Sequence, residues 1–470
     1  MGPRLRHLIV VLPGIGGSVL RTPGGAARWD GHRRQLAAAA LHPARLGLDE
    51  HPELTPVGLL PDIRLAGPFV LPGYDRLVRR IERTFHQVRV DTAGTGRPDP
   101  RADLLLFPYD FRLGTEAAAE RLAAELAPRL AGLTTAGRRR RVVVVAHSMG
   151  GLVARHWLGP LGGAPDCAAL ITLGTPHRGA PKALDLLVNG VRIGPARFDA
   201  VTGVLRGWPS VYELLPRYPA VGAPEGGARY PYQLTDGVPA DFPARAKAAF
   251  GVHAEIERAW TELAGRPELP DLVPVFGRGH ATPQRAVPTP AGLLVTKDAA
   301  EWLPNGHWHG DGTVPAISAV PPDLGEQPSR WRATPDRHLE LPSSATVPDL
   351  LLNYAADSLQ AVRGDTPDRP WLGLDLDEAV LAGTPTPVTV TLHGAAADER
   401  TALRIRARAE DGSGGTDWID CARTGDTAWR ASVPPLPPGA HRVVAEAVGV
   451  PGADRLRCAD VLGAVRAEAP

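Results

Sequence analysis

The stretch that most constrains the fold is a run of four valines that ends in a serine turn. Residues 142–145 are consecutive valines, and β-branched side chains suit a strand that is covered on both faces. The run continues into Ala-His-Ser-Met-Gly-Gly over residues 146–151, and residues 152–158 have helical apolar periodicity. The sequence therefore predicts a buried strand, a sharp turn with Ser148 at its apex, and a helix.

The serine turn matches a known catalytic pattern with one departure. In the pattern G-x-S-x-G a nucleophilic serine lies on a strained strand-to-helix turn. Ala146 stands here where the first glycine is usual. Alanine meets the demand for a small residue as long as the position does not need a positive φ. An ordinary Ser-Met-Gly turn before a helix is the alternative interpretation, so the partners of Ser148 must decide.

The partners that a catalytic serine needs are present in the expected order. A serine hydroxyl requires an adjacent imidazole base, which a carboxylate orients. In hydrolases with this turn, the acid and then the histidine follow the serine along the chain. Asp311 lies between two glycines on a predicted sharp loop, and His338 follows a predicted strand. The sequence thus predicts a catalytic triad of Ser148, Asp311 and His338.

Other residues compete for these roles, and a metal site is also conceivable. The rival bases and acids are His280, His307, His309, Asp271 and Asp336. The spacing His307-x-His309-x-Asp311 resembles the metal cluster of some hydrolases, but such a pattern would have a further histidine where Gly312 stands. We therefore expect no metal and no cofactor.

A first strand and a glycine-rich loop supply the remaining part of the predicted site. Residues 8–12 are apolar, and residues 13–18 read Pro-Gly-Ile-Gly-Gly-Ser. In hydrolases of this type one oxyanion donor comes from such a loop and the other from the residue after the nucleophile. These donors would be the backbone N–H groups of Ile15 and Met149. A phosphate-binding loop is the alternative, but both Gly-Lys-Ser/Thr and the spacing G-x-G-x-x-G are missing.

Alternating strand and helix signals predict a mostly parallel sheet wrapped by helices over residues 1–365. Two stretches interrupt the alternation, at about residues 21–70 and 185–268, and are interpreted as cap or lid insertions; the first is expected to be rich in loops. A strand is predicted at 88–90. A helix is predicted after residue 115, with Leu122, Leu126 and Leu130 four residues apart. Thr115 is expected to cap this helix, and Pro128 to kink or shorten it.

The C-terminal part has a different texture. Residues 363–370 have the composition of a linker. Beyond them, apolar residues alternate with polar ones in short stretches, for example at 388–392 and 403–407. This pattern predicts an immunoglobulin- or fibronectin-like β-sandwich over residues 371–470. No catalytic grouping is present there, so we expect an auxiliary role with a partner that the sequence does not identify.

Bulk properties exclude several classes of function. The net charge of +1 gives no reason to expect a nucleic-acid partner, and the four arginines at 138–141 are interpreted as a solvated connection. The three cysteines are too few for a disulfide framework, so free thiols are favoured. No apolar run reaches the ~18 residues of a membrane span. The apolar run at 8–12 is too short for a signal peptide, so we expect a cytoplasmic protein.

Six stretches, taken together and in order, resemble the lecithin:cholesterol acyltransferase family of α/β-hydrolases. They are Leu-Pro-Gly-Ile-Gly-Gly-Ser at 12–18, Phe-Pro-Tyr-Asp-Phe-Arg at 107–112, Ala-His-Ser-Met-Gly at 146–150, Pro-Ser-Val-Tyr-Glu-Leu-Leu-Pro at 209–216, Gly-Asp-Gly-Thr-Val-Pro at 310–315, and His338. The resemblance implies the α/β-hydrolase fold and the same triad and oxyanion residues. The secreted animal members have a disulfide-held lid, whereas this chain has no cysteine before Cys167. The C-terminal β-domain also lies outside the family's core pattern.

The predicted function is that of a serine-dependent lipid acyl hydrolase or O-acyltransferase. The resemblance implies that a fatty acyl chain is taken from a phospholipid or related ester through an acyl-enzyme. The expected partner is a lipid or other ester substrate, with a membrane or micelle surface as one source of it. Two alternatives stay open: a soluble carboxylesterase or thioesterase that acts on non-lipid esters, and a non-catalytic scaffold that binds a partner through its β-sandwich.

Overall fold

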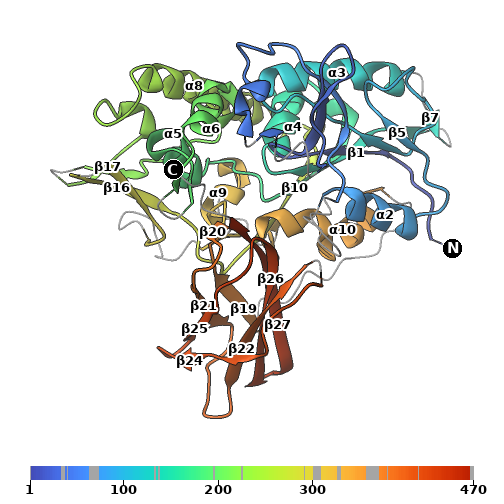
Figure 1. Ribbon diagram of the computed structural model, residues 1–470. Coiled ribbons are helices and arrows are strands. Elements are labelled where there is room, and N and C mark those ends of the chain that lie inside the picture. The colour runs from blue at the N-terminus through green and yellow to red at the C-terminus, as the bar shows by residue number, and fades with distance from the viewer. Residues whose placement is uncertain are drawn as a thin grey trace.

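The fold was analysed in a computed structural model of the chain (Figure 1). It describes residues 2–32, 38–39, 41–62, 73–131, 134–135, 138–193, 196–223, 226–290, 292–299, 309–324, 330–355, 370–377, 379–410 and 412–465. In Figure 1 the helices and the parallel sheet occupy the upper part of the view, and the antiparallel strands of the C-terminal part lie below them.

Seven parallel strands form the central sheet, in the order β18-β15-β10-β9-β1-β6-β5. Their bounds are β1 (Leu8–Leu12), β5 (Val90–Thr92), β6 (Leu104–Leu106), β9 (Val142–His147), β10 (Cys167–Leu173), β15 (Asp271–Gly277) and β18 (Arg332–Thr334). The four valines lie in β9, the middle strand, which is buried along its whole length. Parallel strands end at a common edge, so the turns after β9 and β1 lie side by side.

Helices cover both faces of the sheet, which explains why its middle strands are apolar on both sides. Alternate valines of β9 belong to two different clusters of buried residues. One cluster contains residues of α3 (Thr115–Leu130) and α4 (Gly150–Leu158), and the other contains residues of α2 (Asp75–Thr84) and α10 (Thr346–Ala355). The sheet with its two helical layers is an α/β-hydrolase fold, as predicted.

The remaining elements of this part lie outside the central sheet. The helices are α5 (Pro181–Asn189), α6 (Asp199–Gly207), α7 (Pro209–Tyr212), α8 (Phe242–Leu263), α9 (Ala316–Ala319) and the short 3-10 helices η1 (Pro43–Leu46), η2 (Ala164–Asp166), η3 (Pro231–Gln233), η4 (Pro322–Leu324) and η6 (His338–Ser343). The small sheets are β2 (Ser18–Arg21), β3 (Ala27–Trp29) and β4 (Thr55–Leu59); β13 (Val221–Gly222), β14 (Ala228–Arg229), β16 (Arg285–Thr289) and β17 (Gly292–Thr296); β7 (Thr134–Thr135) with β8 (Arg138–Arg139); and β11 (Arg192–Ile193) with β12 (Ala196–Arg197).

The C-terminal strands form two sheets that enclose one core. The first sheet has the order β19 (Trp371–Asp375), β21 (Thr386–His393), β25 (Ala428–Val433), β24 (Ala422–Arg423). The second has the order β20 (Ala379–Leu381), β27 (Ala453–Val465), β26 (Gly439–Val450), β22 (Ala402–Ala409), β23 (Ile419–Asp420). Buried and less buried residues alternate along β21 and β22, so each sheet turns one apolar face inward. The predicted all-β sandwich is thereby confirmed, whereas most of the predicted linker lies outside the described residues.

Some local predictions were wrong, for identifiable reasons. The short strand falls at Val90–Thr92, two residues later than predicted. Gly114, not Thr115, is the N-cap of α3, because a glutamate from far along the chain accepts the N–H of Thr115. The same helix continues through Pro128. The proline is exposed and lies near the helix end, where water can satisfy the carbonyl that loses its partner. The stretch predicted to be loop-rich also contains β3 and β4.

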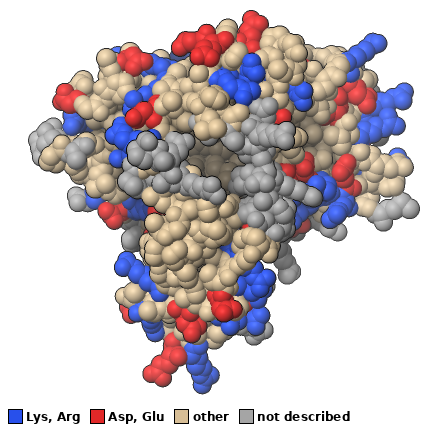
Figure 2. All heavy atoms as spheres, in the orientation of Figure 1, with Lys and Arg blue, Asp and Glu red and all other residues tan. Residues whose placement is uncertain are grey.

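Three further features of the described residues bear on the sequence predictions. All three cysteines, Cys167, Cys421 and Cys458, are free. None of the described helices combines the length and the apolar character needed to cross a membrane. Blue and red side chains are interspersed over the face drawn in Figure 2, which is also hollowed near its centre. The mixed surface agrees with the small net charge.

Candidate active site

Ser148 lies on a strained turn at the carboxyl end of β9. Its φ of 51° is in the left-handed region, which a non-glycine residue rarely adopts. The backbone N–H of Ser148 donates to the carbonyl of Leu173 in the neighbouring strand, at 2.8 Å. Ala146 is still part of the strand and has no positive φ, so its methyl group is tolerated where a glycine is more usual. The turn therefore has the geometry that the sequence pattern predicts.

The structure brings the three predicted triad residues into one hydrogen-bonded chain. The Nε2 atom of His338 is 3.0 Å from Ser148 Oγ, and its Nδ1 atom is 2.7 Å from Asp311 Oδ2. All three side chains are buried. A carboxylate can only accept, so Nδ1 of His338 carries the proton and Nε2 is left as the acceptor of the serine O–H. Ser148 can therefore lose its proton to His338.

The loop of Asp311 keeps its carboxylate ionised in spite of burial. Burial alone would raise the pKa of this group, but the adjacent His338 and the backbone N–H groups of Thr313 and Val314 lower it, and the net pKa lies below the usual value. The two N–H groups donate to Oδ1 at 2.9 and 2.7 Å, which leaves Oδ2 for the imidazole. The backbone N–H of His338 also donates to the carbonyl of Asp311 at 3.1 Å. Two hydrogen bonds therefore connect Asp311 and His338, one between their side chains and one between their backbones.

The rival acids and bases occupy other positions. His280 is fully buried with both ring nitrogens bonded to backbone groups, namely the N–H of Leu374 and the carbonyl of Pro335. Asp271 is the first residue of β15 and lies 3.6 Å from Arg330. The carboxylate that contacts His338 is that of Asp311, not that of Asp271. The Nδ1 atom of His309 lies 3.4 Å from a backbone N–H, and His307 lies outside the described residues. Within the described ranges, no cluster of histidine, cysteine and carboxylate side chains could hold a metal ion.

The glycine-rich loop after β1 lies directly against the nucleophile. A Cβ atom added to Gly14 would stand 2.9 Å from the Cβ of Ser148, and one added to Gly150 would stand 2.5 Å from the carbonyl oxygen of Pro13. This packing places the residue after Gly14, Ile15, beside the turn, and Met149 is the N-cap of α4. The N-terminus of a helix favours negative charge. The geometry is therefore compatible with both predicted oxyanion donors.

Sequence reasoning missed a buried network that joins the glycine loop to the serine turn. The hydroxyl of Tyr74 accepts the N–H of Gly14 at 2.8 Å and lies 2.8 Å from His147 Nδ1. His147 Nε2 lies 3.0 Å from the carbonyl of His338, so it must be the protonated nitrogen. The hydroxyl of Tyr74 consequently donates to Nδ1. Burial lowers the pKa of His147 to about 3, so the ring stays neutral.

Gly174 is a second residue that the sequence did not single out. Its φ is +59°, and an added Cβ would lie 2.8 Å from Asp311 Oδ2 and 3.0 Å from His338 Nδ1. Only glycine combines this backbone conformation with such a close approach. Its place directly after a buried strand was the one available signal. Tyr74 carried no such signal, because nothing in the sequence connects a helix start near residue 74 with a turn at residue 147.

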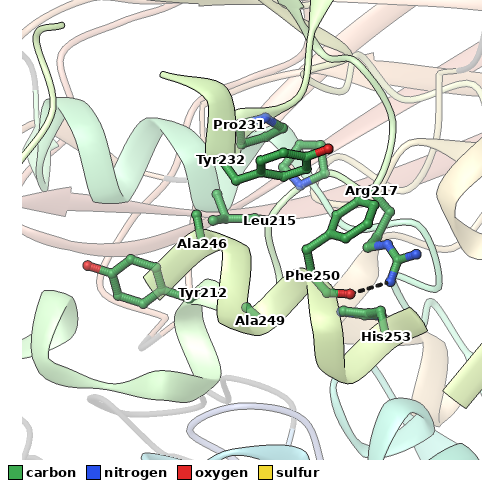
Figure 3. Close-up of a pocket in the computed structure, with 10 residues that line it drawn as sticks. Tyr212, Leu215, Arg217, Pro231, Tyr232, Ala246, Ala249, Phe250 and His253 are labelled. Atoms are coloured by element: carbon green, nitrogen blue, oxygen red, sulfur yellow. Dashed lines mark hydrogen bonds between the residues drawn. The ribbon is translucent and has the colours of Figure 1, made fainter. Parts of the chain in front are cut away.

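A small pocket lies apart from these residues, along α8 (Figure 3). It is lined by Tyr212, Leu215, Pro216, Arg217, Pro231, Tyr232, Ala246, Ala249, Phe250 and His253. Its charged residue is already engaged: Arg217 lies 4.1 Å from the ring centre of Phe250, donates to the carbonyl of Phe250 and pairs with Glu257. No triad residue lines this pocket, so it is a seam between α8 and its neighbours.

Comparison with known proteins gives one family match. Residues 96–227 match the lecithin:cholesterol acyltransferase family. The matched range contains the serine turn and the stretches at 107–112 and 209–216, and Asp311 and His338 lie beyond it. The match confirms the resemblance that the sequence motifs indicated. No curated protein matches the chain in sequence.

The similar solved structures have low scores. The mature form of the Bacillus licheniformis lipase BlEst2 has 11% identity and a TM-score of 0.35, with 76% of this chain and 94% of that chain covered. Its propeptide form has 10% identity and a TM-score of 0.27, with 98% and 95% covered. A superoxide reductase (neelaredoxin) from Ignicoccus hospitalis has 10% identity and a TM-score of 0.17, with 20% and 80% covered. At these scores the likeness carries no weight for the fold, which rests on the strand order.

Proposed function

We propose that this chain, which matches the lecithin:cholesterol acyltransferase family over residues 96–227, is a serine-dependent lipid acyl hydrolase or O-acyltransferase. The observation that carries the proposal is the chain of contacts from Ser148 Oγ to His338 Nε2 (3.0 Å) and from His338 Nδ1 to Asp311 Oδ2 (2.7 Å). An arrangement of a hydroxyl, an imidazole and an ionised carboxylate supports nucleophilic catalysis.

The reaction begins with attack by Ser148 on an ester carbonyl. His338 Nε2 takes the hydroxyl proton as the Oγ–C bond forms, and Asp311 stabilises the resulting imidazolium. The negative charge that develops on the carbonyl oxygen is stabilised by the N–H groups of Ile15 and Met149. The ester C–O bond then breaks, and His338 returns the proton to the leaving alcohol. The acyl chain remains bound to Ser148 as an ester.

The second half of the reaction decides between hydrolysis and transfer. Water or an acceptor alcohol gives its proton to His338 as its oxygen attacks the carbonyl carbon of the acyl-enzyme. The bond between Ser148 Oγ and the acyl carbon then breaks, and His338 returns the proton to Oγ. Water yields a free acid, and an alcohol yields a new ester. We propose that residues within 21–70 and 185–268, which interrupt the sheet as insertions, control which acceptor reaches the acyl-enzyme. The matched family supports a phospholipid or related lipid ester as the acyl donor.

Covalent labelling tests the proposed nucleophile. A fluorophosphonate should label the wild-type protein at a single serine, and Ser148→Ala should abolish labelling with little change in fold. Asp311→Asn and His338→Ala should label more slowly by about 10³-fold or more, because they remove the base or its orientation. Labelling that persists in Ser148→Ala would remove this serine from the mechanism. Incubation with a chelator should leave the labelling rate unchanged.

Product analysis tests the proposed substrate class. Phospholipid vesicles are incubated with the enzyme, with and without a long-chain alcohol or a sterol, and the products are identified by mass spectrometry. Release of fatty acid alone would indicate hydrolysis, and a new ester that contains the added alcohol would indicate transfer. Activity on a short soluble ester together with complete inactivity on the vesicles would contradict a lipid substrate.

A further inference from the structure

We propose that the C-terminal β-sandwich is a working part of the active site, because it holds the two loops that carry Asp311 and His338, with Arg337 and Asp460 as positioning residues. The inference deepens the proposed function and rests on it. It departs from the auxiliary role that the sequence suggested for this part of the chain.

Arg337 makes the most direct connection between the two parts. It precedes His338 in the chain, and its Nε atom forms an ion pair with Asp460 Oδ2 of β27 at 2.8 Å. Its Nη1 and Nη2 atoms donate to the carbonyls of Leu374 and Leu376, at 3.0 and 3.5 Å. The side chains of Arg337 and Asp460 are only 6% and 12% exposed. A buried guanidinium held at three points cannot shift without moving the backbone of its neighbour.

The same guanidinium also packs against the loop of the acid. Gly312 follows Asp311 and has a φ of +92°, and a Cβ added there would lie 2.7 Å from Nη2 of Arg337 and 3.1 Å from its Cζ atom. The absence of a side chain lets the guanidinium lie on the peptide backbone. Arg337 therefore touches both catalytic loops, one through the chain and one through packing, while its polar atoms are directed to the β-sandwich.

His280 forms a second connection between the two parts. The backbone N–H of Leu374 in β19 donates to its Nδ1 atom at 3.2 Å, and its Nε2 atom donates to the carbonyl of Pro335 at 2.8 Å. Its own N–H donates to the carbonyl of Gly310, which precedes the acid. His280 thus links a strand of the β-sandwich and the loop before His338 through its imidazole, and the loop of Asp311 through its backbone N–H.

Further contacts between the two parts involve residues 278 and 279, which precede His280, and Glu340. Arg278 lies 3.7 Å from the ring centre of Trp371, and His393 donates to the carbonyl of Gly279 at 3.2 Å. Arg442 of β26 pairs with Glu340, two residues after the catalytic base, at 3.3 Å. Other contacts between the two parts, such as the pair of Lys297 with Asp375, lie elsewhere. Those of Arg337, His280 and Glu340 involve residues that adjoin or bond to the loops of Asp311 and His338, which indicates a positioning role.

The test compares two carboxylates of the same interface. Asp460→Asn removes the charge that faces Arg337. Asp375→Asn is the matched control, because Asp375 pairs at 2.5 Å with Lys297 across the same interface, with side chains 39% and 40% exposed. The measurements are the rate of fluorophosphonate labelling of Ser148 and the kcat and KM for p-nitrophenyl butanoate, all on the full chain, after circular dichroism has shown that each variant is folded.

Asp460→Asn should lower the labelling rate and kcat by about tenfold or more, because small displacements of a catalytic group have large effects on rate. KM should stay within about twofold, since the substrate is not touched. Asp460→Glu, which restores the carboxylate, should recover part of the loss. Asp375→Asn should remain within about twofold of the wild type in both measurements.

Each result decides the matter. A folded Asp460→Asn with wild-type labelling and kcat would overturn the proposal, as would an equal loss in Asp375→Asn. Should Asp460→Asn not fold, Arg337→Lys takes its place, because lysine keeps the charge but loses the fork that reaches the carbonyls of Leu374 and Leu376. Unlabelled wild-type protein would refute the proposed function itself, and with it the positioning role.

Discussion

Gly174 shows how little space surrounds the buried pair of acid and base. Its positive φ and its distance to Asp311 leave no room for a methyl group. We predict that Gly174→Ala lowers the rate of fluorophosphonate labelling about a hundredfold or more, because the methyl group displaces the carboxylate or the imidazole. The backbone conformation alone should cost about 1–2 kcal/mol of unfolding free energy, which urea unfolding measures.

Gly162 supplies the control for this prediction. It has a similar φ of +69°, and no atom lies within 4 Å of a Cβ added there. Gly162→Ala should therefore lose a similar unfolding free energy and keep the wild-type labelling rate. Equal activity in the two variants would show that the acid–base pair can rearrange, against the close packing argued for Gly174.

Tyr74 offers a second test at the scale of one atom. Tyr74→Phe deprives the N–H of Gly14 of its acceptor and His147 of its donor, both in buried surroundings. We predict a loss of about 1–3 kcal/mol in unfolding free energy, and a kcat lower by about tenfold because the loop of Ile15 is no longer fixed.

The control for this variant is Tyr218→Phe, which removes a similar buried hydroxyl, 3.1 Å from the carbonyl of Gln284. That variant should lose stability and keep its kcat. If Tyr74→Phe also kept its kcat, the network would stabilise the fold without assisting the proposed oxyanion donor of the glycine-rich loop.

The candidate site residues that could be predicted from the sequence are those that lie in short motifs with a recognisable spacing. Ser148 and Asp311 each lie in short motifs whose small neighbours reveal a turn, and chain order then selected His338. The structure brings these three residues together as predicted. Gly174 meets Asp311 and His338 only through folding, and Tyr74 meets His147, the residue before Ser148, in the same way. Single polar or small residues far apart in sequence give no sign of a shared network.

At the scale of elements, a buried carboxylate lies at the start of α3. Glu213 Oε2 accepts the N–H of Thr115 at 2.8 Å, and burial raises the pKa of Glu213 from 4.5 to about 7. A raised pKa means that the protonated form is favoured in the folded state. The stabilisation is complete below the ordinary pKa and is lost as the pH rises through about 7.

We predict that Glu213→Gln flattens the dependence of stability on pH. The wild-type protein should lose about 3 kcal/mol of unfolding free energy between about pH 4.5 and 7.5 through this group. Glutamine can still accept the N–H of Thr115 but does not titrate. Urea unfolding of both proteins across this range measures the difference, and parallel curves for the two would contradict the assignment of Glu213.

Elements with strong periodicity could be predicted, and their exact ends could not. The valine strand and the helix after it follow from the pattern alone, because β9 is buried on both faces. The start of α3 depends instead on Glu213, almost a hundred residues away, which no local rule can supply. The helix does not end at Pro128, because a proline close to an exposed helix end costs one hydrogen bond that water replaces.

At the scale of the whole molecule, the ion pairs across the interface should couple the melting of the two parts. Arg337 and Asp460 are both buried, and the loss of one partner leaves a charge without compensation. We predict one calorimetric transition for the wild-type protein and two, or a clearly broadened one, for Asp460→Asn. Asp375→Asn should melt as the wild type does. Two transitions in the wild type would show that the parts unfold independently.

The arrangement of the two parts was the least predictable feature. Alternation of apolar residues was enough to predict a β-sandwich after a parallel sheet, and the strand orders bear this out. The position of the β-sandwich against the parallel sheet depends on contacts of Arg337 and His280 with strands β19 and β27. These residues and strands are far apart in the chain. The sequence alone gives no role for the arginine that precedes His338. Its contact with the C-terminal part becomes visible only in the structure, where Asp460 lies against it.

The neighbouring positions of Arg337 and His338 have a consequence for synthesis on the ribosome. All three triad residues have been translated once residue 338 leaves the tunnel, but the support of Arg337 arrives with residue 460. At the usual rates of translation the intervening ~120 residues take on the order of ten seconds. During that interval the proposed base, His338, is not yet held by the contact of Arg337 with Asp460. On the proposed mechanism, acyl transfer would therefore begin only after residue 460 has been translated.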